Sequence, residues 1–431
     1  MTTVQGRFAA VLILLAAMLL AAGFIWQGQW SAVAWRDVRA VAIESDDWGL
    51  AGFIPHAHAL DGLDRDLLDP GSFPAVYWES TLEDGATVSA LAGVLSSFEG
   101  RDGFPAVLQP NYVMGSLAWS SPDSGVAWRE YYWPAVPPAY RRQGLSEAVG
   151  QAMASGVWYP EYHALLHYDP AAREAAVASG GIAAEAARRN IMIFPGSQAA
   201  RELTPQRSWA TLSTELETGL QVFEAAFGRS PGSIIAPDYT WDGRMEKLWL
   251  SRHIDVIQAK REQRFVGRKW GTVAWIRKNL QLRWDYLVHR DRVYLERNCR
   301  FEPAQDPDPD KVAARCIDEV HAAWARGEAA IIEAHRINFV HSDSTVERMG
   351  REALRELLTG LTESSGMSPV YLTDQEIASL MRTGTSVCRR GDRVVVRNWT
   401  RSARLVPLGE ARNRGAVCWM EAESTLVLPA D

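Results

Sequence analysis

The sequence predicts an α/β fold, either a barrel or a doubly wound parallel sheet, followed by a small C-terminal β module. Residues 38–380 alternate short apolar runs with amphipathic, often alanine-rich segments, which is typical of βα units. Several apolar runs end in Asp or His, and such folds collect their chemistry at the carboxyl ends of parallel strands. From about Thr383 onward, turn residues separate short β-rich runs that have no helical period.

The same patterns predict the individual elements and the domain limits. The expected strands are residues 38–44, 105–109, 191–194, 233–236, 254–258, 329–334 and 370–372. The expected helices are residues 85–98, 145–155, 170–189, 208–227, 311–326 and 345–361. We therefore expect three parts, which are a membrane or signal segment (1–34), a βα domain (35–382) and the β module (383–431).

Composition narrows the classes of function. The 431 residues include 45 Lys plus Arg and 52 Asp plus Glu, a net charge of -7, and no basic run is long enough to follow a phosphate backbone. Nucleic acid is therefore not an expected partner. The 18 Trp, 12 Tyr and 12 Phe are a heavy aromatic load, which suits either sugar-stacking platforms or bulky core positions.

The first residues of the chain predict its compartment. Residues 8–26 carry no charge, and a helix of that length rises by about 28 Å, close to the ~30 Å hydrocarbon core of a bilayer. Arg7 precedes this stretch and would stay in the cytoplasm, which places the body of the protein outside. Ala32-Val33-Ala34 also has the form of a signal-peptide cleavage site. We expect a single-pass anchor in the cell membrane with an extracytoplasmic body, or a secreted body if the segment is cleaved.

The four cysteines agree with export. Cys299 lies near Cys316 in the sequence, and Cys388 lies near Cys418, so we expect two disulfide bonds with these pairings. Four unpaired, buried thiols are the alternative. The chain contains no Cys-x-x-Cys, so a thiolate zinc knuckle is not supported.

The first chemical motif is Glu44-Ser45-Asp46-Asp47-Trp48-Gly49, which places two carboxylates at the end of the first expected strand. Neighbouring side chains of a strand point to opposite faces, so one Asp can bind a metal while the other stays free as a base. An ordinary turn or helix cap is the alternative interpretation of Asp-Asp before a glycine.

Histidines supply the second and third motifs. His163 and His167 are four residues apart, a spacing that puts two imidazoles on one face of a helical turn, and neutral imidazole suits zinc. His335 directly follows the apolar run 329–334 and is our candidate general acid, because His exchanges protons near neutral pH. Ordinary core, surface or barrel-rim histidines are the alternative.

These three segments resemble the motifs of the polysaccharide deacetylases, the fourth carbohydrate esterase family. The family's Thr-Phe-Asp-Asp-Gly motif is similar to the segment around Asp46 and Asp47, which implies that Asp46 is the base and Asp47 a metal ligand. Its His-Ser/Thr-x-x-His motif is similar to residues 163–167, which implies that the two histidines are the other ligands. Its Leu-x-His motif is similar to the segment that ends at His335, the implied acid.

The resemblance covers about residues 38–375 and implies a distorted (β/α)7 barrel and a divalent metal ion, with zinc preferred. Three departures stand out. Trp48 is inserted before the glycine, and Ala164 replaces the hydroxyl residue after the first His. The family's Arg-x-Pro-x-Gly motif is matched only loosely around Pro237, without its Arg, so Arg261 and Arg336 are the candidates to hold the base carboxylate. The residues expected to contact the substrate are Trp48, Pro237, Tyr239, Trp241, Arg336 and Asn338.

The sequence therefore supports one leading hypothesis and two alternatives. The leading hypothesis is an exported, membrane-tethered, metal-dependent hydrolase that removes acyl groups, chiefly N-acetyl, from a polysaccharide or cell-envelope glycan. The first alternative is a glycan-binding or scaffold protein of polysaccharide export that lost turnover, and the missing Arg supports it. The second is a glycosidase on a related barrel, with Asp46 and either Asp238 or Asp242 as its carboxylate pair.

Overall fold

The computed structural model of the chain describes residues 31–68, 74–119, 128–192, 207–260, 280, 284, 288–289, 291–363, 366, 368–411 and 415–430. The apolar stretch 8–26, with the anchor predicted there, lies outside these residues. Within them, no helix is both long enough and apolar enough to cross a bilayer.

A parallel sheet forms the centre of the molecule. Its strands are β1 (Ala40–Trp48), β2 (Leu108–Val113), β5 (Glu161–Ala164), β6 (Ser233–Ile234), β7 (Val256–Ala259), β8 (Val293–Glu296), β9 (Cys299–Arg300), β10 (Ala330–His335) and β11 (Val370–Tyr371). The order is β8-β7-β6-β5-β2-β1-β10-β9, with β11 beside the start of β1.

One bent segment joins the two edges of this sheet. β8 pairs with β7, and β9 pairs with β10, both in parallel. Only Arg297 and Asn298 separate β8 from β9, and their amides donate to the carbonyls of Ala259 and Ile331, on the two opposite edges. Residues 293–300 therefore act as a single strand that closes the sheet. Counted in this way, the fold is the distorted (β/α)7 barrel that the resemblance implied.

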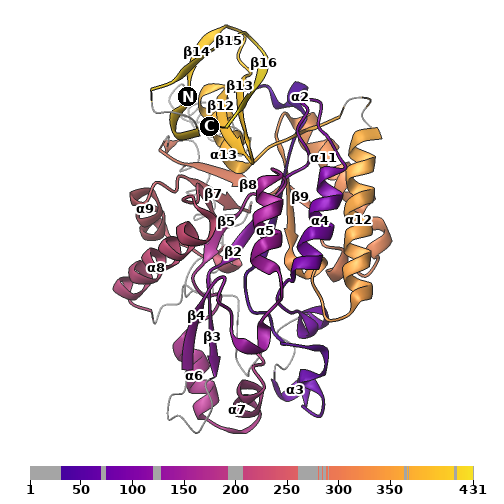
Figure 1. Ribbon diagram of the computed structural model, residues 1–431, viewed down its shortest axis with the longest axis vertical. Helices are drawn as coiled ribbons and strands as arrows, with labels where there is room; N and C mark the ends of the chain where they lie inside the picture. The colour runs from indigo at the N-terminus through magenta and orange to yellow at the C-terminus, as the bar shows by residue number, and fades with distance from the viewer. Residues whose placement is uncertain are drawn as a thin grey trace, which may run out of the picture.

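Most of the helices cover the outside of the barrel, and a hairpin extends from one end of it (Figure 1). The helices are α2 (Trp35–Val38), α3 (Arg65–Leu68), α4 (Gly85–Ser96), α5 (Leu145–Ala154), α6 (Pro170–Ala178), α7 (Gly181–Arg188), α8 (Trp209–Phe227), α9 (Gly243–Ser251), α11 (Val312–Arg326), α12 (Ser344–Glu363) and α13 (Asp374–Thr383). The hairpin consists of β3 (Gly115–Trp119) and β4 (Trp128–Tyr132).

The two faces of β1 belong to two different cores. Val41 and Ile43 belong to the large cluster that also contains the buried faces of α4, α5, α11 and α12. Ala40 and Ala42 point the other way, into a smaller cluster that includes α13. Because side chains of a strand alternate, Glu44 and Asp46 continue the inner row of Ala40 and Ala42. The interior of the barrel thus changes from apolar to polar along β1.

The C-terminal residues form the predicted β module. A three-stranded antiparallel sheet has the order β12 (Thr385–Arg390), β13 (Arg393–Asn398) and β16 (Ser424–Pro429), and a ribbon consists of β14 (Arg404–Pro407) and β15 (Val417–Met420). The guanidinium groups of Arg390 and Arg397 converge on the buried carboxylate of Glu376 in α13, and Arg397 also binds Asp102 at 2.6 Å. These bonds fasten the module to the amino end of the barrel, opposite the β3–β4 hairpin (Figure 1).

Several predicted elements differ from the structure. The expected helix over 170–189 is divided into α6 and α7, because Gly180 and Gly181 both adopt positive φ. The expected strand at 191–194 is not a strand at its described residues. Met192 makes a single backbone bond to Phe53 instead. Residues 163–167 are not helical, since His163 lies on β5 and His167 in the loop that follows. The pattern analysis missed β8 and β9.

The disulfide prediction is wrong, because all four cysteines are free. Cys388 lies on β12 and Cys418 on β15, which belong to different sheets. Cys299 and Cys316 are buried thiols of β9 and α11. Burial raises the pKa of Cys316 well above its usual value and that of Cys388 to about 11, so these thiols stay protonated and unreactive. The cysteines therefore no longer support export.

Candidate functional site

A network of hydrogen-bonded polar side chains runs through the interior of the barrel, from α13 to Asp46. Asp374, the first residue of α13, accepts hydrogen bonds from Gln109 at 2.9 Å and from Gln258 at 2.7 Å. Gln258 and Asn111 bond to each other through both of their amide atoms, at 2.9 and 2.8 Å. Asn111 then donates to Asp46 Oδ1 at 2.8 Å. The bonds between Gln258 on β7 and Asn111 on β2 join strands that are not neighbours, so they cross the interior of the barrel and hold the side chain that binds Asp46.

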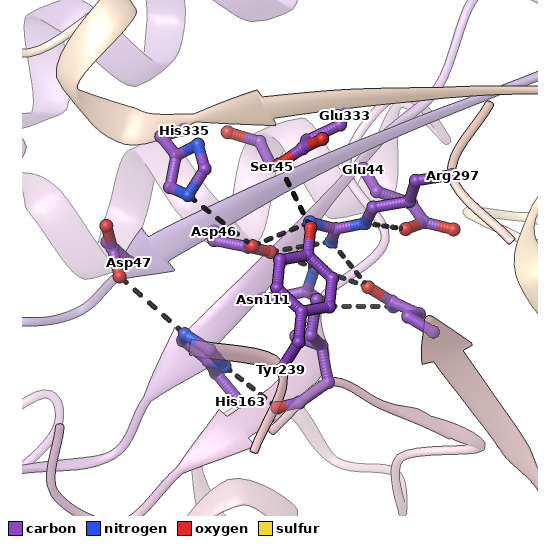
Figure 2. Close-up of polar contacts among 12 residues, drawn as sticks. Glu44, Ser45, Asp46, Asp47, Asn111, His163, Tyr239, Arg297, Glu333 and His335 are labelled. Carbon is purple, nitrogen blue, oxygen red and sulfur yellow. Dashed lines mark hydrogen bonds and ion pairs between the residues drawn. The ribbon is translucent and has the colours of Figure 1, made fainter. Parts of the chain in front are cut away.

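Arg297 holds the carboxylate of Asp46. Its Nη1 and Nη2 donate to Oδ2 and Oδ1 of Asp46 at 2.6 and 2.7 Å, a bidentate pair, and its Nε donates to Glu44 at 2.5 Å (Figure 2). Tyr239 and Gln258 accept further bonds from the same guanidinium at 2.9 and 2.7 Å. Burial alone would raise the pKa of Asp46, but Arg297 outweighs it and lowers the pKa far below the usual range. Asp46 is therefore ionised throughout the physiological range.

Glu44 is the second carboxylate that contacts Arg297. Burial and the nearby carboxylate of Asp374 raise the pKa of Glu44 well above its usual value, against the opposing effect of Arg297. Asp46, which Arg297 contacts through two bonds, is therefore the main partner of the guanidinium.

His335 forms a second charged pair beside the first. Its Nδ1 donates to Glu302 at 2.5 Å, and its Nε2 lies 3.8 Å from Oδ2 of Asp46. Burial lowers the pKa of His335, but the charge of Glu302 and its hydrogen bond raise the pKa more, to about 10. His335 is therefore protonated at neutral pH, with Nε2 directed toward Asp46 (Figure 2). Asn338 donates to Glu302 at 2.7 Å and so orients this pair.

Asp47, His163 and His167 form a compact group of candidate metal ligands. Asp47 has a φ of 71°, which turns it out of the inner row of β1. Its Oδ1 lies 3.6 Å from Nε2 of His163 and 3.3 Å from Nε2 of His167, and the two Nε2 atoms are 3.1 Å apart. The Nδ1 of His163 donates to the carbonyl of Ile235 at 2.8 Å, so the free lone pair lies on Nε2, facing Asp47. Two imidazoles and one carboxylate that converge in this way fit a zinc ion.

A second set of potential ligands, Glu302, Glu333 and His335, lies in the same cavity. Protein groups already satisfy this set, because His335 binds Glu302, while Glu333 pairs with Lys260 at 2.5 Å and accepts from Tyr239 at 3.0 Å. The group of Asp47, His163 and His167 is therefore the better candidate for a cation.

Both groups open into a cavity of about 560 Å³ at the carboxyl end of the barrel, a size that suits one or two sugar rings. Tyr239 and Arg336, two of the predicted contact residues, line it. Trp48, Pro237, Trp241 and Asn338, which were also predicted to contact a sugar, are buried and do not line this cavity. The indole of Trp48 donates to Ser45 and packs edge-on against Trp158, and that of Trp241 donates to Glu246.

Arg336 joins the loops that carry the two groups. It donates to Glu83 at 2.9 Å and to the carbonyl of Leu50 at 2.5 Å, and Glu83 also accepts from the amide of Gly49 at 2.9 Å. The loop after Asp47 is thus clamped to the loop after His335. Arg336 is therefore not the partner of Asp46. Arg261, the other candidate for that role, lies outside the described residues.

Arg297, Asn111 and Glu302 were not predicted from the sequence. Arg297 follows β8, but the apolar run of that strand has only three residues and ends at Glu296, so it gives a weak signal. Glu302 and Asn111 gave no such signal, because each acts through a partner that is distant in sequence.

Comparisons with known proteins give distant structural matches. No protein-family model matches the chain, and no curated protein matches it significantly. A crystal structure from Mycobacterium smegmatis assigned as a polysaccharide deacetylase matches with 13% identity and a TM-score of 0.32, over 78% of this chain and 93% of that one. IcaB from Ammonifex degensii matches with 10% identity and a TM-score of 0.23, over 56% and 94%.

A GH57-type branching enzyme from Pyrococcus horikoshii matches with 11% identity and a TM-score of 0.29, over 77% of this chain and 68% of that one.

Proposed function

We propose that this protein is a metal-dependent hydrolase that removes acyl groups, chiefly N-acetyl, from a polysaccharide or cell-envelope glycan. One observation carries the proposal. A carboxylate and two imidazoles that can hold a metal share one cavity with an ionised Asp and a protonated His. Hydrolysis of an amide needs an electrophile, a proton acceptor and a proton donor, and these groups can supply all three.

Asp47, His163 and His167 would hold the cation, with zinc preferred. When bound, a divalent cation supplies Lewis-acid polarisation of the acyl carbonyl and stabilises the charge that develops on its oxygen. The chain's own residues move the protons. Asp46 accepts a proton from the attacking water as the new C–O bond forms. His335 donates its Nε2 proton to the sugar nitrogen as the C–N bond breaks, which releases acetate and a free amine.

The residues that contact Asp46 and His335 support this division of roles. Arg297 and Asn111 fix Asp46 in its ionised form, and Glu302 keeps His335 protonated. The best support for a protein without turnover was the missing third-motif Arg, and Arg297 supplies that group from another strand. Asp242 cannot be the second carboxylate of the glycosidase alternative, because it caps α9 outside the cavity and binds Arg244.

Export and tethering are further parts of the proposal, and they rest on the uncharged residues 8–26. We propose a single-pass membrane protein whose catalytic body lies outside the cytoplasm.

The test is metal content, measured by mass spectrometry on the purified chain and on a His163→Ala, His167→Ala double variant. We expect close to one zinc or similar ion per chain in the parent and almost none in the variant. The parent should then release acetate from acetylated glycans. A parent that binds no ion after incubation with zinc, cobalt or nickel would refute the proposal, and so would reducing ends as the product.

A further inference from the structure

The β14–β15 ribbon presents an apolar face to solvent. Leu405 pairs with Trp419, and Pro407 pairs with Val417, so these four side chains lie on the same face in two cross-strand pairs. Leu405, Val417 and Trp419 are 58%, 57% and 60% exposed, whereas the alternate residues of the ribbon point into the module. Five of the ten large, exposed apolar side chains in the described part of the chain belong to this small module. Scattered exposure does not explain such a concentration.

The chain enters the described structure beside the same module. The amide of Ala32 donates to the carbonyl of Met381 at 2.8 Å, and Val33 and Trp35 are buried in the cluster that contains α13. Only five residues, 27–31, separate Ala32 from the apolar stretch 8–26. At ~3.6 Å per residue they reach no more than about 20 Å. If residues 8–26 span the bilayer, the module therefore lies against the membrane surface.

The charge of the module differs from that of the rest of the chain. Residues 383–431 contain eight arginines, no lysine and five acidic residues, a net charge of +3, although the whole chain has a net charge of -7. A groove of about 1100 Å³ runs between β12, β14 and the amino end of the barrel. The side chains described as lining it include four arginines and no carboxylate, and Ser386 Oγ is buried there without a hydrogen-bond partner. Arg229, Arg382 and Arg390 pair with carboxylates behind the groove, so the attraction of the module to the anionic headgroups of a membrane rests on its net charge.

We propose that the outward face of the β14–β15 ribbon docks on the lipid bilayer, with Trp419 and Leu405 inserted at the interface. This inference rests on the membrane tether of the proposed function. A Trp with its indole N–H bonded to Glu421 at 3.0 Å and surrounded by aliphatic side chains matches the residues found at membrane interfaces.

Docking at this face also sets the direction of the catalytic cavity. The module covers the amino end of the barrel, while the cavity opens at the carboxyl end, where Asp46 and Asp47 near the end of β1 line it. At ~3.3 Å per residue, the part of β1 that precedes Asp46 separates the cavity from the amino end by about 20 Å. The substrate is then a glycan of the envelope above the membrane and not a sugar still linked to lipid at its surface.

The test places a fluorescent probe at the ribbon in the full chain. A Leu405→Cys variant, with Cys418→Ser to remove the half-buried native thiol, is labelled with an environment-sensitive dye and reconstituted in phosphatidylcholine–phosphatidylglycerol vesicles. The matched control is Leu67→Cys in the same background, because Leu67 is 60% exposed on α3. Docking predicts that lipids carrying a quencher remove most of the fluorescence at position 405 and little at position 67.

The other outcomes overturn the inference in distinguishable ways. Equal, weak quenching at both positions in chains that float with the vesicles would leave the tether intact and refute docking. Energy transfer between probes at position 405 would assign the face to a second copy of the chain. A spectral shift caused by added peptidoglycan without vesicles would assign it to a sugar. Chains that do not float would refute the tether and docking together, independently of acetate release.

Discussion

Two buried clusters of arginine and carboxylate occupy opposite ends of the barrel. At the carboxyl end, Arg297 and Asp46 are almost completely buried, and the same is true of Glu376 and Arg390 at the amino end. The difference is what surrounds them. Asp46 lines the cavity and lies 3.8 Å from Nε2 of His335, whereas Glu376 contacts only backbone and side chains that fasten the β module. The same interaction therefore prepares a reactive group at one end and holds a structure together at the other.

Replacing Asp46 with Asn should have the largest effect on activity and separate catalysis from metal binding. Asn is nearly isosteric and still accepts a bond from Arg297, but it cannot take a proton from water. We expect the rate of acetate release to fall by roughly 10²–10⁴-fold. Metal content, measured by mass spectrometry, should stay near that of the parent. Loss of the metal in this variant would reverse the roles assigned to Asp46 and Asp47.

Arg297→Met should reduce both stability and activity. It leaves the carboxylate of Asp46 buried without its cation, which costs about 3–5 kcal/mol of unfolding free energy. The control is Arg292→Met, because Arg292 pairs with Glu246 at 2.7 Å and is also buried, but outside the cavity. Urea unfolding should show a loss for both variants, and acetate release should be lost only in Arg297→Met. A folded Arg297→Met enzyme with full turnover would show that Asp46 needs no such partner.

The sequence predicted those features of the site that depend on a short stretch of the chain. An apolar run that ends in Asp or His is visible in the sequence, so the placement of Asp46, Asp47 and His335 at one end of a barrel was predicted. The pairing of Asp46 with Arg297 was not, because the two are 251 residues apart and meet only when residues 293–300 close the sheet. β8 itself has three apolar residues in a row between Arg292 and Glu296, too few for a pattern to identify.

The burial of the aromatic side chains was the other property that the sequence did not predict. Trp48 and Trp241 lie beside motif residues, and an aromatic side chain in that position suits either a sugar or a core. The fold decides between them, since Trp158 packs against Trp48 and Glu246 accepts from Trp241. The disulfide prediction failed for a related reason, because proximity in sequence does not place two thiols on the same sheet.

Glu376→Gln should change how stability depends on pH, without a loss of turnover. Burial raises the pKa of Glu376, but Arg390 and Arg397 outweigh it and lower the pKa to about 2, below the ordinary value near 4.5. The folded state therefore gains stability from this group above pH 4.5 and loses it as the pH falls toward 2. Between pH 7 and pH 3, we expect the variant to lose on the order of 2 kcal/mol less unfolding free energy than the parent.

Urea unfolding at the two pH values measures this difference for Glu376→Gln. The control is Glu185→Gln, because Arg188 and Arg189 also lower the pKa of that carboxylate, but at the surface of α7. Solvent screens these pairs, so the control should change the pH dependence of the parent much less. A Glu376→Gln variant with the parent's pH dependence would show that the module is fastened by other contacts.

The smallest effect on stability is expected at the outward face of the ribbon. Leu405→Ser and Trp419→Ala remove side chains that are more than half exposed, so the unfolding free energy should change by less than about 0.5 kcal/mol, and acetate release from a soluble substrate should not change. Met420→Ala, one residue along and 2% exposed, should cost about 2–5 kcal/mol. If the outward variants proved as costly as Met420→Ala, the fold would account for the apolar face. If they prove harmless, neither stability nor turnover explains why Leu and Trp face solvent there, and contact with the bilayer is the role that remains to be measured.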